Sequence, residues 1–313
     1  MKKIKIALLF GGISGEREVS LKTGEKICAA LDKNKYTVEK YDPKTDLEKF
    51  FIKASRHEFD LIFPALHGPF GEDGKLQGLL DMLGIPYVFS GTLASALAMH
   101  KPLTKIIAKN AGLILAKDVL LKKEEKYNLN LIIKKLAFPI VVKPAELGSS
   151  VGTSIAKNLQ ELKKSIKDAF QYGREILLEE YIQGRELTVV VMGNNPPKAL
   201  LVIEIIPQVS AWFDYRAKYA EGGSAEICPA DIPRKIAKKI QEDSVKIFKK
   251  LGCADLARAD FIWSAKNKKI YFLEINTIPG MTAQSLAPKV AKTMGLEFGE
   301  FLDKLIEGAL KRK

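Results

Sequence analysis

The stretch Tyr271-Phe-Leu-Glu-Ile-Asn-Thr-Ile-Pro-Gly-Met281 is an apolar strand pattern that Glu274 and Asn276 interrupt and that a Pro-Gly turn closes. Residues two apart on a strand point to the same face, so this carboxylate and this amide are expected to lie together. A buried carboxylate needs a cation or a hydrogen-bond partner. Hard divalent cations such as Mg²⁺ prefer oxygen ligands of this kind. Taken alone, the stretch predicts either a metal site or a polar cap at a strand end.

A second segment repeats this pattern just before the first. The run Asp255-Leu-Ala-Arg-Ala-Asp-Phe-Ile-Trp263 is apolar and carries Arg258 and Asp260 two residues apart. The polar stretch Ser264–Lys269 joins the two segments, so we expect a β-hairpin with all four polar side chains on adjacent strands. Two acids, an amide and an arginine on a rigid sheet favour Mg²⁺–nucleotide chemistry over a structural cluster of ion pairs.

The composition is that of a globular protein with a basic surface. The chain has 313 residues, of which 47% are hydrophobic and 28% charged, which predicts two or three domains with cores of their own. The net charge is +13, from 50 Lys and Arg against 37 Asp and Glu. The lysines are spread along helical patterns such as residues 234–250, which favours a solvated surface without a nucleic-acid partner. A basic nucleic-acid-binding protein is the distant alternative, and it would bind with a steep salt dependence.

The cysteines and the N-terminal run predict a cytoplasmic location. Cys28, Cys228 and Cys253 lack metal-ligand spacing and cannot all pair, as in a reducing compartment. The apolar part of residues 1–10 is too short for a signal peptide and predicts a buried first strand. No stretch approaches the roughly 20 apolar residues that span a bilayer, so no membrane partner is expected.

Residues 1–100 predict an α/β domain. Strand-like runs at 4–10, 36–41, 59–66 and 87–89 alternate with helical patterns at 17–31 and 74–83. Such alternation favours a doubly wound parallel sheet of the Rossmann type. Ligands bind beyond the carboxyl ends of such strands, where Gly11–Glu16 and His67–Gly74 are expected to lie.

The rest of the chain predicts an α+β fold with mostly antiparallel sheets, in two subdomains at about residues 101–185 and 186–313. Residues 207–229 lack periodicity but contain aromatic residues, so we expect an ordered lid. Lys143 precedes the glycine-rich turn Gly148–Gly152, which predicts a phosphate clamp, with an ordinary hairpin as the alternative.

Five motifs occur in one order along the chain: Gly11–Ser20, Leu66–Gly74, Lys143-Pro144 with Gly148–Gly152, Lys218-Tyr219 and Glu274–Thr282. Together they resemble the ATP-grasp ligases, and within them the D-alanine:D-alanine ligases of cell-wall peptidoglycan synthesis, nearly from end to end. The resemblance implies a pre-ATP-grasp domain followed by two ATP-grasp subdomains. It also implies that ATP phosphorylates one D-alanine, and that the amine of a second D-alanine attacks the acyl phosphate.

The resemblance assigns residues to the two amino acids. Arg258 and the backbone N–H of Gly280 would stabilise the oxyanion of the tetrahedral intermediate. Glu16 would hold the ammonium of the first D-alanine, and Ser149 and Tyr219 would join Glu16 in a hydrogen-bond network. His67 would lie near the same amino acid. Ser285 and the Leu286 N–H would bind the carboxylate of the second D-alanine.

The resemblance likewise assigns the ATP and metal contacts. Two Mg²⁺ or Mn²⁺ ions would be held by Asp260, Glu274 and Asn276, with Glu274 bridging them. The hinge strand with Glu179, Glu180 and Ile182 would contact the adenine, and Glu186 would hold the ribose. The phosphate contacts are assigned to three lysines and to the glycine-serine turn: Lys101, Lys143, Lys218, Ser149, Ser150 and Val151.

Two positions depart from the family pattern. Leu147 stands where an acid usually precedes Gly-Ser-Ser, with Glu146 one place earlier, and His100 replaces the common acid before Lys101. Tyr219 favours a dipeptide over an ester product, since ester-forming relatives carry a different residue there. The family resemblance also implies a homodimer. Another ATP-grasp ligase that joins a different carboxylate and amine is the alternative within the enzyme class.

Overall fold

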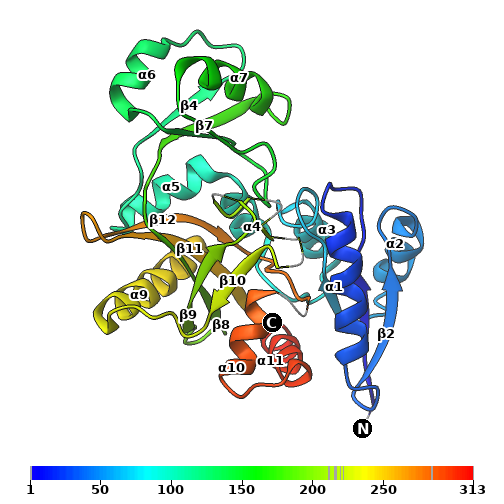
Figure 1. The fold of residues 1–313 in the computed structure, drawn as a ribbon. Helices are drawn as coiled ribbons and strands as arrows, with labels where there is room; N and C mark the ends of the chain where they lie inside the picture. The colour runs from blue at the N-terminus through cyan, green and yellow to red at the C-terminus, as the bar shows by residue number, and fades with distance from the viewer. Residues whose placement is uncertain are drawn as a thin grey trace.

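The computed structural model describes residues 2–210, 212–214, 217–218, 220, 222–282 and 285–312. Its strands form three sheets (Figure 1). The first sheet is parallel, with the order β2–β1–β3, and consists of β1 (Ile4–Leu9), β2 (Tyr36–Tyr41) and β3 (Leu61–Pro64).

Helices cover the first sheet on both faces: α1 (Arg17–Ala30), α2 (Leu47–Ser55) and α3 (Lys75–Leu83). Alternate residues of β1 point to opposite faces. Ile6 and Leu8 therefore share a core with α1, whereas Ala7 and Leu9 share one with α2 and α3. The expected strand at residues 87–89 is only an isolated bridge between Tyr87 and Ile62, because the chain leaves the sheet edge at once.

The second sheet is antiparallel, with the order β4–β7–β5–β6, and one core joins it to two helices. Its elements are β4 (Asp118–Lys122), β5 (Ile140–Pro144), β6 (Ser154–Ala156), β7 (Glu175–Glu180), α6 (Leu129–Leu136) and α7 (Leu159–Ala169). In Figure 1 this layer lies above the rest of the molecule.

The third sheet is also antiparallel, with the order β10–β9–β8–β11–β12, and it contains the expected hairpin as β11 and β12. Helices α4, α5 and α9 share its core. These elements are β8 (Arg185–Met192), β9 (Lys198–Pro207), β10 (Ser224–Ile227), β11 (Leu256–Ser264), β12 (Lys269–Asn276), α4 (Thr92–Met99), α5 (Lys101–Asn110) and α9 (Arg234–Leu251).

Two helices close the chain, α10 (Leu286–Thr293) and α11 (Phe298–Leu310). Leu302 and Ile306 of α11 lie in the same core as Ile27 of α1, so the end of the chain joins the first sheet to the third. Within the described residues, no helix is long and apolar enough to cross a membrane. The predicted fold class, a doubly wound parallel sheet followed by two antiparallel sheets, is confirmed.

Candidate active site

The β11–β12 hairpin presents four polar side chains to one face of the third sheet. Arg258 pairs with Asn276 across the two strands, and Asp260 pairs with Glu274. The intervening Ala259 points the other way into the core, as strand alternation requires. Arg258 clamps the Asp260 carboxylate with Nε–H···Oδ1 at 2.9 Å and Nη2–H···Oδ2 at 2.7 Å. The hairpin is thus a rigid carrier of charge.

A further hydroxyl holds Asp260 from the neighbouring strand. Thr188 on β8 donates to Asp260 Oδ1 at 2.5 Å, and both side chains are buried. Charge-assisted hydrogen bonds of this kind hold a carboxylate in one orientation. Asp260 is therefore fixed from two sides.

Cations surround Glu274. Burial alone would raise the pKa of Glu274, but Lys101, Lys218, Lys143 and Arg258 together lower that pKa to about 2. Lys101 Nζ lies 4.0 Å from Glu274 Oε2, a longer distance than a direct hydrogen bond. Glu274 is consequently ionised at neutral pH while its oxygens face the cavity.

A cavity of about 740 Å³ opens beside this hairpin and is lined by residues from all parts of the chain. This volume lies in the range of small-molecule and cofactor sites. The cavity brings together residues that the sequence predicted for the two amino acids, the phosphates and the metal ions: Glu16, His67, Lys101, Ser149, Lys218, Arg258, Glu274, Asn276, Gly280, Ser285 and Leu286. Other predicted residues are not among those that line it: Lys143, Ser150, Val151, Glu179, Glu180, Ile182, Glu186 and Asp260.

One end of the cavity surrounds the Glu16 carboxylate. The hydroxyl of Ser149 donates to Glu16 Oε2, which joins the first domain to the glycine-serine turn. A Cβ atom on Gly68 would lie 3.0 Å from Glu16 Oε1, and one on Gly148 would lie 3.1 Å away. The carboxylate thus fits between two glycines because neither has a side chain.

His67 lies buried at the base of the same end. Its Nε2 lies 3.1 Å from Thr23 Oγ1 of α1, and its carbonyl accepts a hydrogen bond from Ser14 at 2.6 Å. Burial lowers the pKa of His67, against the opposing effect of Glu16. A neutral His67 therefore fixes the loop around Glu16.

The other end lies at the start of α10. Ser285 precedes this helix, and its Oγ accepts a hydrogen bond from the Thr282 N–H at 2.9 Å. A Cβ atom on Gly280 would lie 2.7 Å from Ser285 Oγ, so the turn can approach this closely only with glycine. The first N–H groups of a helix attract anions. Ser285 and the Leu286 N–H are thus suited to a carboxylate.

Of the expected nucleotide residues, Lys143 and Glu179 lie on the second sheet, whereas Glu186 lies on β8 of the third sheet. Glu179 on β7 is buried, forms an ion pair of 2.5 Å with Lys143 Nζ and accepts a further hydrogen bond from Lys105 Nζ. Burial would lower the pKa of Lys143, but Glu179 raises it overall, which keeps this lysine charged. Lys143 therefore connects β5 to β7 beside the cavity.

The residues of the expected hinge are held by neighbouring segments. The carboxylate of Glu180 accepts from the Lys117 N–H at 2.9 Å, and the Glu180 N–H donates to the Lys117 carbonyl at 3.0 Å. Ile182 follows the end of β7 and is half-buried. Burial raises the pKa of Glu186 to about 8 despite Lys218 nearby.

The glycine-serine turn has an unusual backbone. Ser149 and Ser150 adopt positive φ values of 52° and 60°, which side-chain-bearing residues rarely do. Such strain is concentrated at functional sites. Val151 follows, and its N–H donates to the Gly148 carbonyl at 3.1 Å.

The segment expected to form a lid contacts this turn. Ser150 Oγ donates to the carbonyl of Phe213 at 3.1 Å, and Lys218 Nζ lies 5.1 Å from the centre of the Phe213 ring. Phe213 and Lys218 line the cavity. Tyr219, the predicted partner of Ser149, lies outside the described residues.

The two departures from the family pattern meet in space. His100 Nε2 lies 3.6 Å from Glu146 Oε1 and 3.3 Å from Glu175 Oε2. The carbonyl of Leu147 accepts a hydrogen bond from Lys101 Nζ. Leu147 thus contributes its backbone where an acid was expected, and Glu146 faces the unusual histidine.

Two further residues were missed from the sequence. Glu72 lines the cavity, accepts from the Gly68 N–H at 2.6 Å, and has its pKa raised by burial and by Glu16. Lys105 is buried against Glu179, one helical turn after Lys101. Only its spacing of four residues from Lys101 on a helix could have indicated Lys105. No signal in the sequence distinguished Glu72 from an ordinary acidic residue in a turn.

The donor set for a metal can be tested on the hairpin. Asp260 and Glu274 lie opposite each other, and the Asn276 Oδ1 accepts from the Ile278 N–H at 2.9 Å, which fixes the amide. Two carboxylates and an amide oxygen fit a hard divalent cation. In the described residues, no group of three or more His, Cys, Asp and Glu side chains forms a metal centre, so the amide would have to complete the set.

The three sheets, the strained turn and the acid-bearing hairpin around one cavity define an ATP-grasp ligase. Family models described as the D-ala D-ala ligase C-terminus and N-terminus match residues 107–307 and 39–90. The chain belongs to the D-alanine–D-alanine ligase family. The predicted family and enzyme class are confirmed, and membership argues against the nucleic-acid-binding alternative.

Several known proteins are similar to this chain over nearly its whole length. The D-alanine–D-alanine ligase of Syntrophobacter fumaroxidans is 46% identical over 311 residues, which cover 99% of each chain. The crystal structure of the Bacillus anthracis D-alanine–D-alanine ligase matches with a TM-score of 0.87 and 35% identity over 98% of each chain, and one described as complexed with ATP matches with 0.86. The VanG D-Ala:D-Ser ligase of Enterococcus faecalis matches with 0.85 and 34% identity, covering 98% of this chain and 99% of that one.

Proposed function

We propose that this protein joins two D-alanine molecules into D-alanyl-D-alanine at the expense of ATP, as a step of peptidoglycan synthesis. The carboxylate of the first D-alanine takes the γ-phosphoryl group, and the amine of the second attacks the acyl phosphate, which releases ADP and phosphate. One observation carries the proposal: Glu16, Arg258 and Ser285, distant in sequence, line one cavity. Their charges and hydroxyl complement an ammonium, a developing oxyanion and a carboxylate.

The first D-alanine would bind between Glu16 and Arg258. Glu16 attracts its ammonium, and Ser149 holds Glu16 in place. Arg258, oriented by Asp260, faces the carboxylate and then the oxyanion of the tetrahedral intermediate, together with the Gly280 N–H. The second D-alanine would place its carboxylate on Ser285 and the Leu286 N–H, so that its amine points toward the acyl group.

ATP would lie along the second sheet. The lysines Lys101, Lys143 and Lys218 and the N–H groups of the glycine-serine turn, residues 149–151, are suited to phosphates. The backbone between Glu179 and Ile182 would read the adenine edge, and Glu186 would hold the ribose hydroxyls.

Two Mg²⁺ or Mn²⁺ ions would be held by Asp260, Glu274 and Asn276. When bound, such ions neutralise phosphate charge and align the transferred group. The protein's own contribution is a preorganised set of oxygens: Arg258 and Thr188 hold Asp260, and the surrounding lysines keep Glu274 ionised.

Three further features belong to this proposal. We infer three domains, an N-terminal substrate domain at residues 1–100 and two ATP-grasp subdomains at residues 101–185 and 186–313, with residues 207–229 as the lid. We also infer a homodimer, as the family resemblance implies, which sedimentation would test. A cytoplasmic location agrees with the three cysteines, which form no disulfide.

The assay is direct. The purified protein is incubated with ATP, Mg²⁺ and D-alanine, while phosphate release is followed and the product is identified by mass spectrometry. We expect phosphate release that requires both D-alanine and Mg²⁺, with one dipeptide formed for each phosphate. Equal activity with L-alanine would contradict the substrate assignment.

A second candidate is a D-alanine:D-serine ligase, because the Enterococcus faecalis structure with that printed activity matches almost as well. Competition between D-alanine and D-serine in one reaction separates the two. Predominance of the mixed dipeptide at equal concentrations would favour the second candidate.

A further inference from the structure

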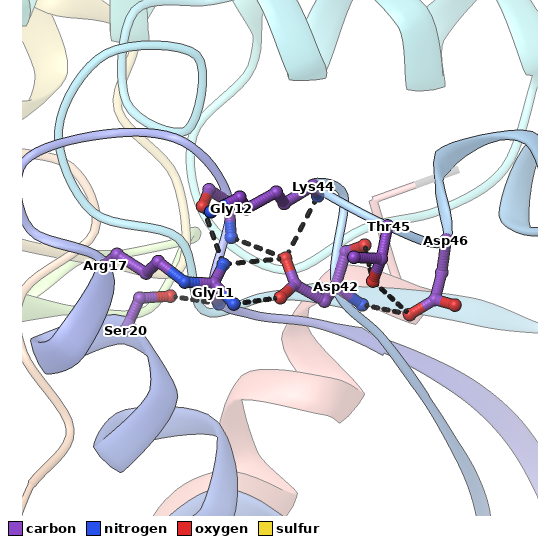
Figure 2. Close-up of polar contacts among 8 residues, drawn as sticks. All are labelled: Gly11, Gly12, Arg17, Ser20, Asp42, Lys44, Thr45 and Asp46. Atoms are coloured by element: carbon purple, nitrogen blue, oxygen red, sulfur yellow. Dashed lines mark hydrogen bonds and ion pairs between the residues drawn. The ribbon is translucent and has the colours of Figure 1, made fainter.

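A polar network lies outside the cavity, at the carboxyl end of the first sheet (Figure 2). Its centre is Asp42, the residue that follows β2. Asp42 Oδ1 accepts hydrogen bonds from the Gly12 N–H at 2.8 Å and the Lys44 N–H at 3.0 Å. Arg17, the first residue of α1, donates to Oδ1 at 3.0 Å and to Oδ2 at 2.5 Å. One carboxylate thus ties β2, the loop after β1 and the start of α1 together.

The glycines of this loop serve the carboxylate. Gly11 and Gly12 have φ values of +89° and +75°, and a Cβ on Gly11 would lie 2.8 Å from the Asp42 carboxylate. Both positions therefore require glycine, one because Asp42 occupies the space and both because L side chains avoid this conformation. The sequence pointed to residues 11–16 as part of a ligand site; Glu16 of this stretch lines the cavity, whereas Gly11 makes room for Asp42.

Arg17 lies at a helix position that is electrostatically unfavourable for a cation. A cation in the first turn of a helix opposes the helix dipole. Arg17 nevertheless donates to the Gly12 carbonyl at 2.7 Å and pairs with Asp42, both side chains being largely shielded at 28% and 17% exposure. The hydrogen bonds from Arg17 lower the pKa of Asp42 to about 2, so the ion pair persists at neutral pH.

The pair adjoins the group that faces substrate. Glu16 is the residue before Arg17 and the N-cap of α1, and both Glu16 and Glu18 line the cavity. Arg17 and Asp42 are not among the lining residues. The pair can therefore influence substrate through the backbone at the start of α1, which carries Glu16 and Glu18 into the cavity wall.

We propose that the Arg17–Asp42 ion pair positions Glu16 for the ammonium of the first amino acid. It fixes the start of α1 against the ends of β1 and β2, so that the Glu16 carboxylate stays between Gly68 and Gly148. Arg17 and Asp42 are positioning residues, since neither lines the cavity. This inference rests on the proposed function, in which Glu16 binds that ammonium.

The chain offers a matched control. Lys40 lies on β2, two residues before Asp42, and pairs with Glu25 of α1 at 2.8 Å. Glu25 lies more than two helical turns beyond Arg17, far from the start of α1. Both pairs join β2 to α1, but only one adjoins Glu16.

The experiment compares Asp42→Asn, Arg17→Met, their double variant and Arg17→Lys with Lys40→Met. The asparagine can still accept from the Gly12 and Lys44 N–H groups, so the loop keeps its backbone contacts. Two D-alanine sites give two Michaelis constants in the saturation curve. We expect the constant for the first D-alanine to rise about tenfold in the first two variants, with kcat changed by less than about threefold.

Further readouts separate positioning from general damage. The double variant should be no worse than Arg17→Met, because both single changes remove the same ion pair and Arg17→Met also removes the hydrogen bond to the Gly12 carbonyl. Arg17→Lys should recover part of the loss, and Lys40→Met should resemble the unmodified protein. The ATP constant and the thermal unfolding midpoint are measured for every variant.

An unchanged first D-alanine constant in Asp42→Asn and Arg17→Met would overturn the inference, as would an equal effect of Lys40→Met. A loss of kcat with both D-alanine constants moving together would also overturn it. If the unmodified protein forms no D-alanyl-D-alanine, the proposed function fails instead, and the two failures are thereby distinguished.

Discussion

Glu274 and Glu179 are both acids among lysines, but they meet those lysines differently. Glu179 is buried and contacts Lys143 and Lys105 directly. Glu274 faces the cavity with 29% of its side chain exposed, and its ion pair with Lys101 spans 4.0 Å. The first acid is occupied by its partners, whereas the second is kept ionised by more distant charges. The same residue types thus hold the second sheet together at one place and, in the proposed function, bind a ligand at the other.

Removing the charge of Glu274 gives the largest expected effect and tests the binding half of this comparison. Glu274→Gln should lower kcat by about 10²- to 10³-fold, because an ionised oxygen needed for the phosphoryl-transfer site is lost. The thermal midpoint should fall less than in Glu179→Gln. Steady-state kinetics with calorimetry would check this, and a nearly active Glu274→Gln protein would break the comparison.

Glu179→Gln tests the cohesive half. The substitution leaves Lys143 and Lys105 without their shared carboxylate in a buried place, which should destabilise the protein by about 3 kcal/mol. Urea unfolding measures this change. The exposed pair Arg174–Glu124 provides the control, because Glu124→Gln removes a pair whose side chains are 80% and 61% exposed. A loss no larger than that of Glu124→Gln would contradict the cohesive role.

Glu186 sharpens the comparison through the pH dependence of stability and not through activity. Burial raises the pKa of Glu186 to about 8, so the folded protein holds this proton more tightly than the unfolded chain, whose pKa is near 4.5. The stability that the neutral group contributes is complete below about pH 4.5 and is lost as the pH rises through about 8.

Glu186→Gln keeps a neutral side chain at every pH. Its free energy of unfolding should therefore gain on that of the unmodified protein by about 1.4 kcal/mol for each pH unit across this window, and by no more than about 5 kcal/mol in all. Urea unfolding at several pH values measures the difference between the two proteins. A difference that stays constant with pH would show that Glu186 titrates normally.

Local sequence patterns predicted much of the fold and the polar residues that the hairpin contributes to the candidate site. Alternation in residues 256–276 predicted the hairpin, because a strand repeats every two residues and polar groups then share a face. The strand run at residues 87–89 misled, because β propensity cannot tell a paired strand from a bridge at an edge. Lys105 and Glu72 gave no distinctive signal, since their roles depend on partners distant in sequence.

The sequence by itself determined the order of the elements, the separation of a parallel from two antiparallel sheets, and the family through five motifs. The first two follow from short-range periodicity and from spacing within single segments, and the family follows from the resemblance of the motifs to known ligases. Only the tertiary structure decided that Gly11 makes room for Asp42, that Lys143 pairs with Glu179, and that Glu16 lies between Gly68 and Gly148. Such contacts join residues far apart in the chain, and packing of the three sheets against one another sets their distances.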